Sequence, residues 1–159
     1  MLLSQISILG PLSATPHAGL RSLDRRFPEP PLTANPSSDP WPTEIRLLDN
    51  GRNLRVAFDD GTSFTMSAEL LRVRSPSAEV QGHSPAERKT IGGKRHVAII
   101  AVAPVGNYAI RLDFDDMHRT GIYTWRYLRE LGETAEKSFA AYLDELAAKA
   151  LDRDRPGEA

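Results

Sequence analysis

The chain contains no cysteine among its 159 residues. Disulfide bonds, thiolate zinc sites, iron–sulfur ligation by this chain and cysteine nucleophiles are therefore all excluded. No apolar run approaches the roughly 20 residues that a membrane-spanning helix requires, so we expect no membrane association. The absence of cysteine fits a reducing compartment, and we expect the protein to be cytoplasmic.

A strong excess of charge of either sign is also absent, since 20 basic and 21 acidic residues leave a net charge of −1. A local basic cluster lies within residues 88–95, but no aromatic residues are interleaved with it. The glycines beside this cluster lack the spacing of a phosphate-binding loop. We therefore expect no nucleic-acid partner.

Proline is abundant but unevenly placed, because eight of the 12 prolines lie within residues 1–42. Proline removes a backbone donor and disfavours helix at the preceding residue. We interpret residues 1–40 as a disordered proline-rich leader, residues 41–132 as the folded domain and residues 133–159 as a C-terminal helix and tail.

Alternating apolar residues predict a β-meander at the start of the folded domain. The segment 44–58 alternates on both sides of Asn50-Gly51, which is a strong hairpin signal. A second turn and a third short strand follow, and Ser67 is placed to cap a helix with the sequence SAELLR.

The second half of the domain repeats this kind of pattern. Residues 75–96 are polar and predict a surface loop, and strands are expected over 96–103 and 108–114. A helix is expected to begin at Thr124 and to end just before Gly132, which would reverse the chain.

The last predicted helix begins near Thr134. Its apolar residues recur at helical spacing and predict one buried stripe, formed by Phe139, Leu143, Leu146 and Ala150. The whole pattern predicts an α+β fold, namely a small β-rich antiparallel domain with short helices and a C-terminal amphipathic helix.

Two segments share the same order of features. LRVAFDDG…SAELLR at 54–72 and IRLDFDDM…TWRYLR at 110–129 each contain an alternating strand, a Phe-Asp-Asp turn and a capped helix. Ser67 and Thr124 lie 57 residues apart, whereas the two Phe-Asp-Asp tripeptides lie 56 apart. We hypothesise a pair of similar strand–turn–helix units; the alternative is coincidence of common turn chemistry.

The stretch FDDMHRTGIYTW, residues 114–125, combines residue types found at metal sites. Asp115, Asp116 and His118 could ligate zinc or iron, but such close neighbours supply at most two ligands with compatible directions. Paired aspartates in a turn more often accept backbone hydrogen bonds, which is our interpretation here. We expect Gly121 to supply a backbone angle that other residues disfavour.

Signatures of catalysis are missing. None of the four histidines begins a His-x-Asp or His-x-Glu pair, so the iron-binding triad of non-haem oxygenases has no candidate. A Gly-x-Ser-x-Gly nucleophile elbow is absent as well. No nucleophile–base pair can be named from the sequence, so an enzyme with an unrecognised site is the weakest alternative, and we expect neither enzymatic activity nor a cofactor.

Several motifs together resemble a known family. The segments LLRVRSPSAEVQGH, GNYAIRLDFDD and His-x-Thr-Gly-Ile-Tyr-x-Trp-x-Tyr-Leu are similar to the gamma-butyrobetaine hydroxylase-like N-terminal domain family, over residues 41–132. The resemblance implies a compact β-rich α+β domain. Members are mostly small stand-alone bacterial proteins of unknown function, and some are attached to carnitine-pathway dioxygenases or iron–sulfur carrier ATPases.

The resemblance also implies a vestigial zinc site. Zinc-binding relatives hold the metal with three cysteines and one histidine; the histidine matches His118, and the cysteines match Ser75, Ser77 and Val80. Hydroxyls and a valine do not replace thiolates, so we expect His118 to pack near residues 75–80 without a metal. Membership does not imply hydroxylase activity, because the oxygenase domain has no counterpart in this sequence.

We expect the chain to act by binding a protein partner or a second copy of itself. The candidate binding face comprises Tyr108, Arg111, Asp115, His118, Tyr123 and Trp125. The alternative is a metal-binding or iron–sulfur-related accessory protein, with His118 and Asp115 or Asp116 as ligands.

Overall fold

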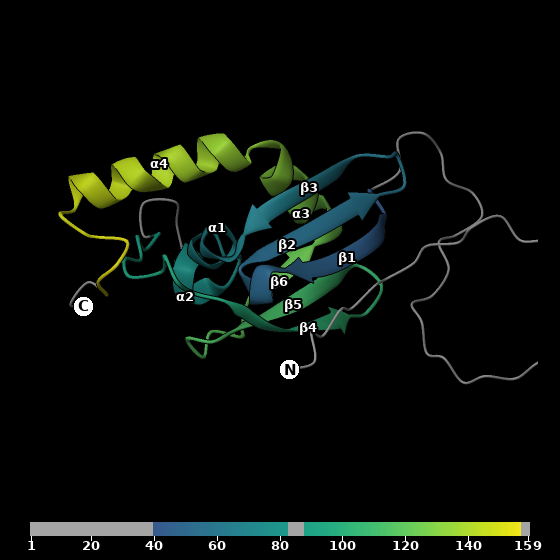
Figure 1. Ribbon diagram of the computed structural model, residues 1–159, viewed down its shortest axis with the longest axis horizontal. Helices are drawn as coiled ribbons and strands as arrows, with labels where there is room; N and C mark the ends of the chain where they lie inside the picture. The colour runs from purple at the N-terminus through teal and green to yellow at the C-terminus, as the bar shows by residue number, and fades with distance from the viewer. Residues whose placement is uncertain (1–39, 83–87, 157–159) are drawn as a thin grey trace, which may run out of the picture.

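The computed structural model describes residues 40–82 and 88–156 (Figure 1). The predicted disordered leader lies outside the described residues, except for Pro40. The division into leader, domain and C-terminal tail therefore stays a prediction.

The described residues form two three-stranded antiparallel sheets together with helices, which confirms the predicted α+β class (Figure 1). Both sheets are meanders in which consecutive strands are neighbours, and side chains from both meet in one hydrophobic core. The first sheet contains β1 (Pro42–Leu48), β2 (Asn53–Phe58) and β3 (Ser63–Ser67), and the second contains β4 (Ile99–Val105), β5 (Ala109–Phe114) and β6 (Ile122–Thr124).

Helices follow each meander. Helix α3 packs against β3 of the first sheet, and α4 packs against α1. In Figure 1, α4 extends along one side of the molecule, away from the second sheet. The bounds are η1 (Asp49–Gly51, a 3-10 turn), α1 (Ala68–Val73), α2 (Ala78–Gln81), α3 (Trp125–Glu133) and α4 (Ala135–Ala148).

The turn and cap signals read from the sequence are confirmed. Asn50 has a φ of 56° in the turn between β1 and β2, a conformation that asparagine tolerates better than most residues. The Leu70 N–H donates to Ser67 Oγ at 3.2 Å, and the Tyr127 N–H donates to Thr124 Oγ1 at 3.2 Å. Each hydrogen bond satisfies a donor that the first helical turn leaves free.

The two similar segments are a structural repeat, which confirms the hypothesis of paired units. Strands β1 and β4 begin 57 residues apart, β2 and β5 begin 56 apart, and α1 and α3 begin 57 apart. Equivalent backbone hydrogen bonds recur: Asp59 N–H donates to the Trp41 carbonyl at 2.9 Å, and Asp115 N–H to the Ala98 carbonyl at 3.0 Å. We call β1–β3 with α1 the first unit and β4–β6 with α3 the second unit.

Ion pairs link the units reciprocally. Arg72 of α1 contacts Asp116 in the turn of the second unit, with Nε and Oδ2 2.8 Å apart. Arg129 of α3 contacts Asp60 in the turn of the first unit, with Nη1 and Oδ2 2.7 Å apart. Each unit's helix thus binds the other unit's Phe-Asp-Asp turn, so the two units share one core and are not separate domains.

Gly132 was wrongly predicted to reverse the chain after the helix. It lies inside α3, which continues to Glu133 and is followed by the C-cap Thr134. A Cβ at Gly132 would lie 2.4 Å from the Phe64 ring of β3. The glycine is therefore needed for close packing between α3 and the first sheet.

Other local predictions were also shifted. Strand β4 begins at Ile99 and not at 96, and the polar segment 75–96 contains the short helix α2. In α4 the buried residues are Tyr142 and Leu146, whereas Leu143 is 37% exposed. Tyr142 and Leu146 pack against Val73 of α1. Contact with α1 therefore determines which residues of α4 are buried, and the spacing of its leucines alone does not. None of the helices within 40–82 and 88–156 has the length and apolar character needed to span a bilayer.

Candidate functional site

The residues predicted to form a binding face do not share one exposed surface. Tyr123 is 0% exposed and Trp125 is 5% exposed, whereas Tyr108 is 52% exposed. The Tyr123 hydroxyl donates to the Leu71 carbonyl at 2.7 Å, and Trp125 Nε1 donates to the Asn107 carbonyl at 2.8 Å. Both aromatic residues thus lie in the core with satisfied polar tips.

Arg111 behaves as its strand pattern predicts. Its side chain is 43% exposed, while the neighbouring residues Ile110 and Leu112 are fully buried. Arg111 Nε donates to Asp113 Oδ1 at 2.9 Å on the same side of β5. Of the predicted face, Arg111 therefore lies on the outer side of the second sheet, and His118 lies in the interior.

The paired aspartates have the turn-forming role that the sequence predicted. Asp115 Oδ1 accepts the Ala98 N–H at 3.1 Å, and Asp116 Oδ1 accepts the His118 N–H at 3.3 Å. Gly121 does not have the unusual backbone angle that was expected, because its φ is not positive. A Cβ at Gly121 would instead lie 2.4 Å from Ser75 Oγ, so the glycine makes room for this serine.

His118 packs against residues 75–80, as the resemblance implied. His118 Nε2 lies 2.8 Å from Ser75 Oγ, and His118 Nδ1 lies 3.2 Å from Glu79 Oε2. We call Ser75, Ser77, Glu79, Val80 and His118 the histidine corner. All of these are buried apart from Glu79, whose side chain is 65% exposed.

In the histidine corner, the histidine contacts a serine hydroxyl through Nε2 and a carboxylate through Nδ1, which is the connectivity of the catalytic triad in serine hydrolases. Sequence reasoning missed this nucleophile–base pair because Ser75 and His118 lie 43 residues apart. A nucleophile must reach a substrate, however, and Ser75 is 0% exposed and packs against Gly121. The Ser77 N–H also donates to Ser75 Oγ at 3.4 Å. The arrangement is a hydrogen-bonded chain in the interior and offers no exposed nucleophile.

A charged cluster lies beside the histidine corner. Asp116 Oδ2 accepts hydrogen bonds from Arg72 Nε at 2.8 Å and from Lys94 Nζ at 2.6 Å. Although burial acts to raise it, the pKa of Asp116 is lowered by the Lys94 hydrogen bond and the Arg72 charge. The pKa of His118 is lowered, first by burial and then by the Arg72 charge, so the imidazole is favoured in its neutral form.

The donors of the histidine corner do not fit zinc. The histidine corner contains one imidazole with two serines and a valine and no thiolate, and zinc in structural sites is held by thiolates and imidazoles. Ser77 Oγ is buried without a hydrogen-bond partner among the described residues. Within those same residues, no group of three or more histidine, cysteine, aspartate or glutamate side chains is arranged to hold a metal ion.

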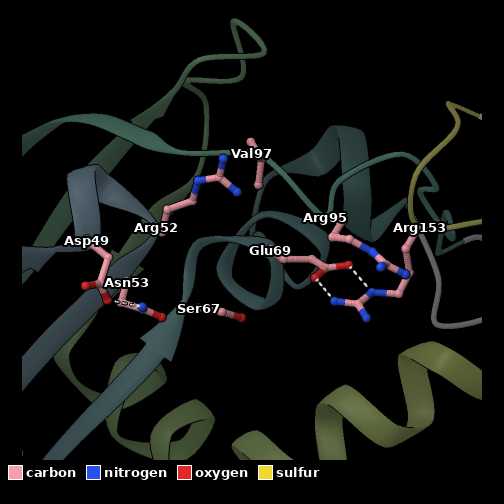
Figure 2. Close-up of a pocket in the computed structure, with 8 residues that line it drawn as sticks. All are labelled: Asp49, Arg52, Asn53, Ser67, Glu69, Arg95, Val97 and Arg153. Atoms are coloured by element: carbon pink, nitrogen blue, oxygen red, sulfur yellow. Dashed lines mark hydrogen bonds and ion pairs between the residues drawn. The ribbon is translucent and has the colours of Figure 1, made fainter.

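A second candidate site is a polar hollow of about 460 Å³ beside the N-terminal end of α1 (Figure 2). Figure 2 shows Arg153, from the C-terminal tail, bound to Glu69 of α1 by two hydrogen bonds of 2.8 and 2.5 Å. This pair neutralises the buried Glu69 carboxylate. Sequence reasoning missed the hollow because its walls are distant in the chain; they are Asp49, Arg52, Asn53, Ser67, Glu69, Arg95, Val97 and Arg153.

His118 gives a testable pH dependence. Its pKa is lowered below 6.5 in the folded state, so the unfolded chain takes up the proton first as the pH falls. The free energy of unfolding should therefore decrease as the pH falls from above 6.5 to the lowered pKa, and then level off. His118→Gln should remove this decrease. Asp116 does not interfere above about pH 5, because its pKa is lowered and the unfolded carboxyl takes up protons only near its ordinary pKa of 3.8. Urea unfolding between pH 8 and pH 5 measures the free energy of unfolding of the wild type and of His118→Gln. If the two free energies change with pH in parallel, the expectation is contradicted.

The fold and the histidine corner together define a small α+β module with a buried, hydrogen-bonded serine–histidine pair. The family described as "Gamma-butyrobetaine hydroxylase-like, N-terminal" matches residues 45–129. This chain belongs to that family.

The chain is also similar to several solved structures. Two structures determined by NMR in solution are each 40% identical to the chain with TM-scores of 0.65; one covers 77% and the other 80% of it, and the chain covers 95% of each. A crystal structure from Acidithiobacillus ferrooxidans ATCC 23270, of a protein with unknown function in the DUF971 family, is 39% identical. The aligned region covers 62% of this chain and 98% of the crystallised chain, with a TM-score of 0.49. No curated protein matches the chain.

Proposed function

We propose that the chain is a non-catalytic protein-binding module that acts through the outer face of its second sheet. Antiparallel pairing places directly opposite residues on the same face. Arg111 pairs with Ala103 on one side and Ile122 on the other, and Asp113 pairs with Ala101. We define the second-sheet face by Ile100, Ala101, Ala103, Arg111, Asp113 and Ile122.

The second-sheet face is accessible and largely apolar. Ile100 is 64% exposed and Ile122 is 43% exposed, whereas Ile99, next to Ile100, is 2% exposed. The register of β4 shifts between Ile99 and Ala101, and this irregularity directs Ile100 outward. Antiparallel sheets with one solvated face normally alternate buried apolar residues with exposed polar ones.

The observation that carries the proposal is the contrast with the first unit. Its equivalent outer face has Glu44 and Arg46 on β1 where the second unit has Ala101 and Ala103. Glu44 and Arg46 form an ion pair of 2.6 Å, and Thr65 occupies the position equivalent to Ile122. Two copies of one backbone thus carry polar residues on the outer strands of the first sheet, β1 and β3, and apolar residues on the outer strands of the second, β4 and β6. The outer face of the first unit shows the polar residues that this backbone carries when the face is in contact with solvent. The apolar residues at the equivalent positions of the second unit support contact with a partner.

The face also indicates the chemistry of the partner. Its two charges, on Arg111 and Asp113, are of opposite sign and lie 2.9 Å apart at Nε and Oδ1. The face therefore has no net charge, and electrostatic attraction of a highly charged ligand is not favoured. An apolar protein surface that carries charges of both signs is the best complement.

Site-specific photocrosslinking in cells tests the proposal. A photoreactive phenylalanine analogue placed at Ile122 should give an adduct of defined composition with a protein. The same analogue at Thr65, the equivalent position of the first unit, is the matched control and should give none. Adduct formation at position 122 should decrease several-fold when Ile100→Thr is added. Equal adducts at both positions, or none at 122, would refute this function.

A further inference from the structure

We infer that the protein bound by the second-sheet face is a second copy of this chain. This inference rests on the proposed function and names its partner. The face carries both halves of a charge pair, Arg111 and Asp113, with their Nε and Oδ1 atoms 2.9 Å apart. A surface with one charge of each sign is self-complementary, because a two-fold axis brings each charge of one copy to the opposite charge of the other.

One two-fold arrangement satisfies the charges. If the axis lies in the interface, perpendicular to the strands and above Leu112, it exchanges the positions of Arg111 and Asp113. Arg111 then faces Asp113 of the second copy, and Asp113 faces its Arg111. An axis parallel to the strands would place Arg111 on Arg111 and is disfavoured by like-charge repulsion.

The same axis also matches the sizes of the side chains. It brings β4 over β4 of the second copy, so that the row of Asp113 lies over the row of Arg111. Ile100, at the register shift beside Ala101, then meets Ala103 of the second copy, and a large side chain packs against a small one. The equivalent residues of the first unit are Thr43 and Arg46, which would place a buried guanidinium at this contact.

The expected affinity is modest. A face of three short strands buries less surface than the roughly 800 Å² per partner of a standard stable interface. We therefore expect a reversible dimer with a dissociation constant on the order of 100 μM.

Sedimentation equilibrium of the full-length chain, at concentrations on both sides of about 100 μM, tests the inference. The wild-type protein should change from monomer to dimer across this range. Asp113→Arg alone places two arginines on each face and should weaken the dimer at least tenfold. The double exchange R111D/D113R keeps one charge of each sign and should restore most of the affinity. This restoration also shows that the single variant did not fail merely by unfolding.

Apolar variants give the second arm of the test. Ile100→Thr with Ile122→Thr installs the residues that the first unit carries, Thr43 and Thr65, and should abolish dimerisation. Leu143→Thr is the matched control, because Leu143 is also an exposed apolar residue but lies on α4. This control should leave the dimer unchanged. A wild-type monomer throughout, or a dimer that survives the threonine pair, overturns the inference.

The crosslink at position 122 separates this inference from the proposed function. An adduct with the mass of two chains supports both. An adduct with a different protein leaves the binding function in place and overturns the self-association. A crosslink to residues 1–39 of the same chain overturns both.

Discussion

Gly51→Ala is expected to lower the free energy of unfolding by about 3 kcal/mol or more. Gly51 has a φ of +81°, a left-handed conformation that an L-residue with a Cβ adopts at a cost. A Cβ there would also lie 2.1 Å from the Ile99 carbonyl oxygen of β4. Because the obstacle is the backbone of a paired strand, rotation of a side chain cannot relieve the clash, and the two units would have to separate locally.

Gly61→Ala is the matched control for this prediction. Gly61 has a similar φ of +84°, but a Cβ there would meet no atom within 4 Å. Only the backbone cost remains, about 1 kcal/mol. Urea unfolding of both variants isolates the close approach between the turn of the first unit and β4. Equal losses of stability would contradict the packing of the units at Gly51.

The local elements could be predicted because their signals are local. Asn50-Gly51 marks a turn whatever surrounds it, and Ser67 and Thr124 cap helices through a hydrogen bond within three residues. The repeat was visible for the same reason, since both units use the same turn and cap chemistry. These features fix where strands and helices begin, and hence the α+β class.

The roles of two glycines, Gly121 and Gly132, could not be predicted from the sequence. Gly121 and Gly132 were assigned to backbone conformation, but the structure uses both for space. Their neighbours, Ser75 and Phe64, lie 46 and 68 residues away in sequence, so no local pattern indicates these contacts. Whether a glycine serves a turn or a close approach depends on the tertiary structure.

A reciprocal exchange of volume between the units accompanies the position of the histidine corner beside the Phe-Asp-Asp turn of the second unit. By the 57-residue offset, Gly121 is equivalent to Phe64, and Gly132 is equivalent to Ser75. In one place the Phe64 ring fills the space over Gly132; in the other, Ser75 fills the space over Gly121. The smaller serine leaves room for His118, whose equivalent in the first unit is Thr62 by the 56-residue offset of the Phe-Asp-Asp turns; the Phe58 N–H donates to the Thr62 carbonyl as the Phe114 N–H donates to the His118 carbonyl. One unit thus closes its turn with an aromatic ring, and the other with a hydrogen-bonded histidine.

The burial of Tyr123 and Trp125 also could not be predicted from the sequence. Aromatic residues with polar tips occur both in cores and at interfaces, and their sequence pattern does not distinguish the two. The second-sheet face became visible only when β4 and β6 were placed beside β5. Ile100 belongs to the unbroken apolar run Ile99-Ile100 in the sequence, and only the register shift in β4 separates the buried residue from the exposed one.

The triple variant S75C/S77C/V80C is expected to bind one zinc ion per chain through the three thiolates and His118. Ser75 Oγ already lies 2.8 Å from His118 Nε2, and Ser77 and Val80 are 4% and 1% exposed. Structural zinc sites of this kind have apparent binding free energies on the order of 10 kcal/mol at a 1 M standard state, so about 10 μM free zinc stabilises the folded state by about 3 kcal/mol. The melting temperature with equimolar zinc should therefore rise by about 10 °C or more, while the wild type should not shift.

The metal-free variant is expected to be slightly less stable than the wild type, because Val80→Cys removes buried apolar volume. The control adds His118→Asn to the three cysteines; it should bind zinc much more weakly and lose most of the thermal shift. Zinc affinity should also decrease as the pH is lowered, since the thiols and His118 bind the metal only when deprotonated. Titration with a chelator competitor, in the presence of a non-thiol reductant, measures the affinity. A folded triple variant that binds no zinc would show that residues 75–80 and His118 are not arranged to hold a metal, and would contradict the predicted match of Ser75, Ser77 and Val80 to zinc-ligand positions.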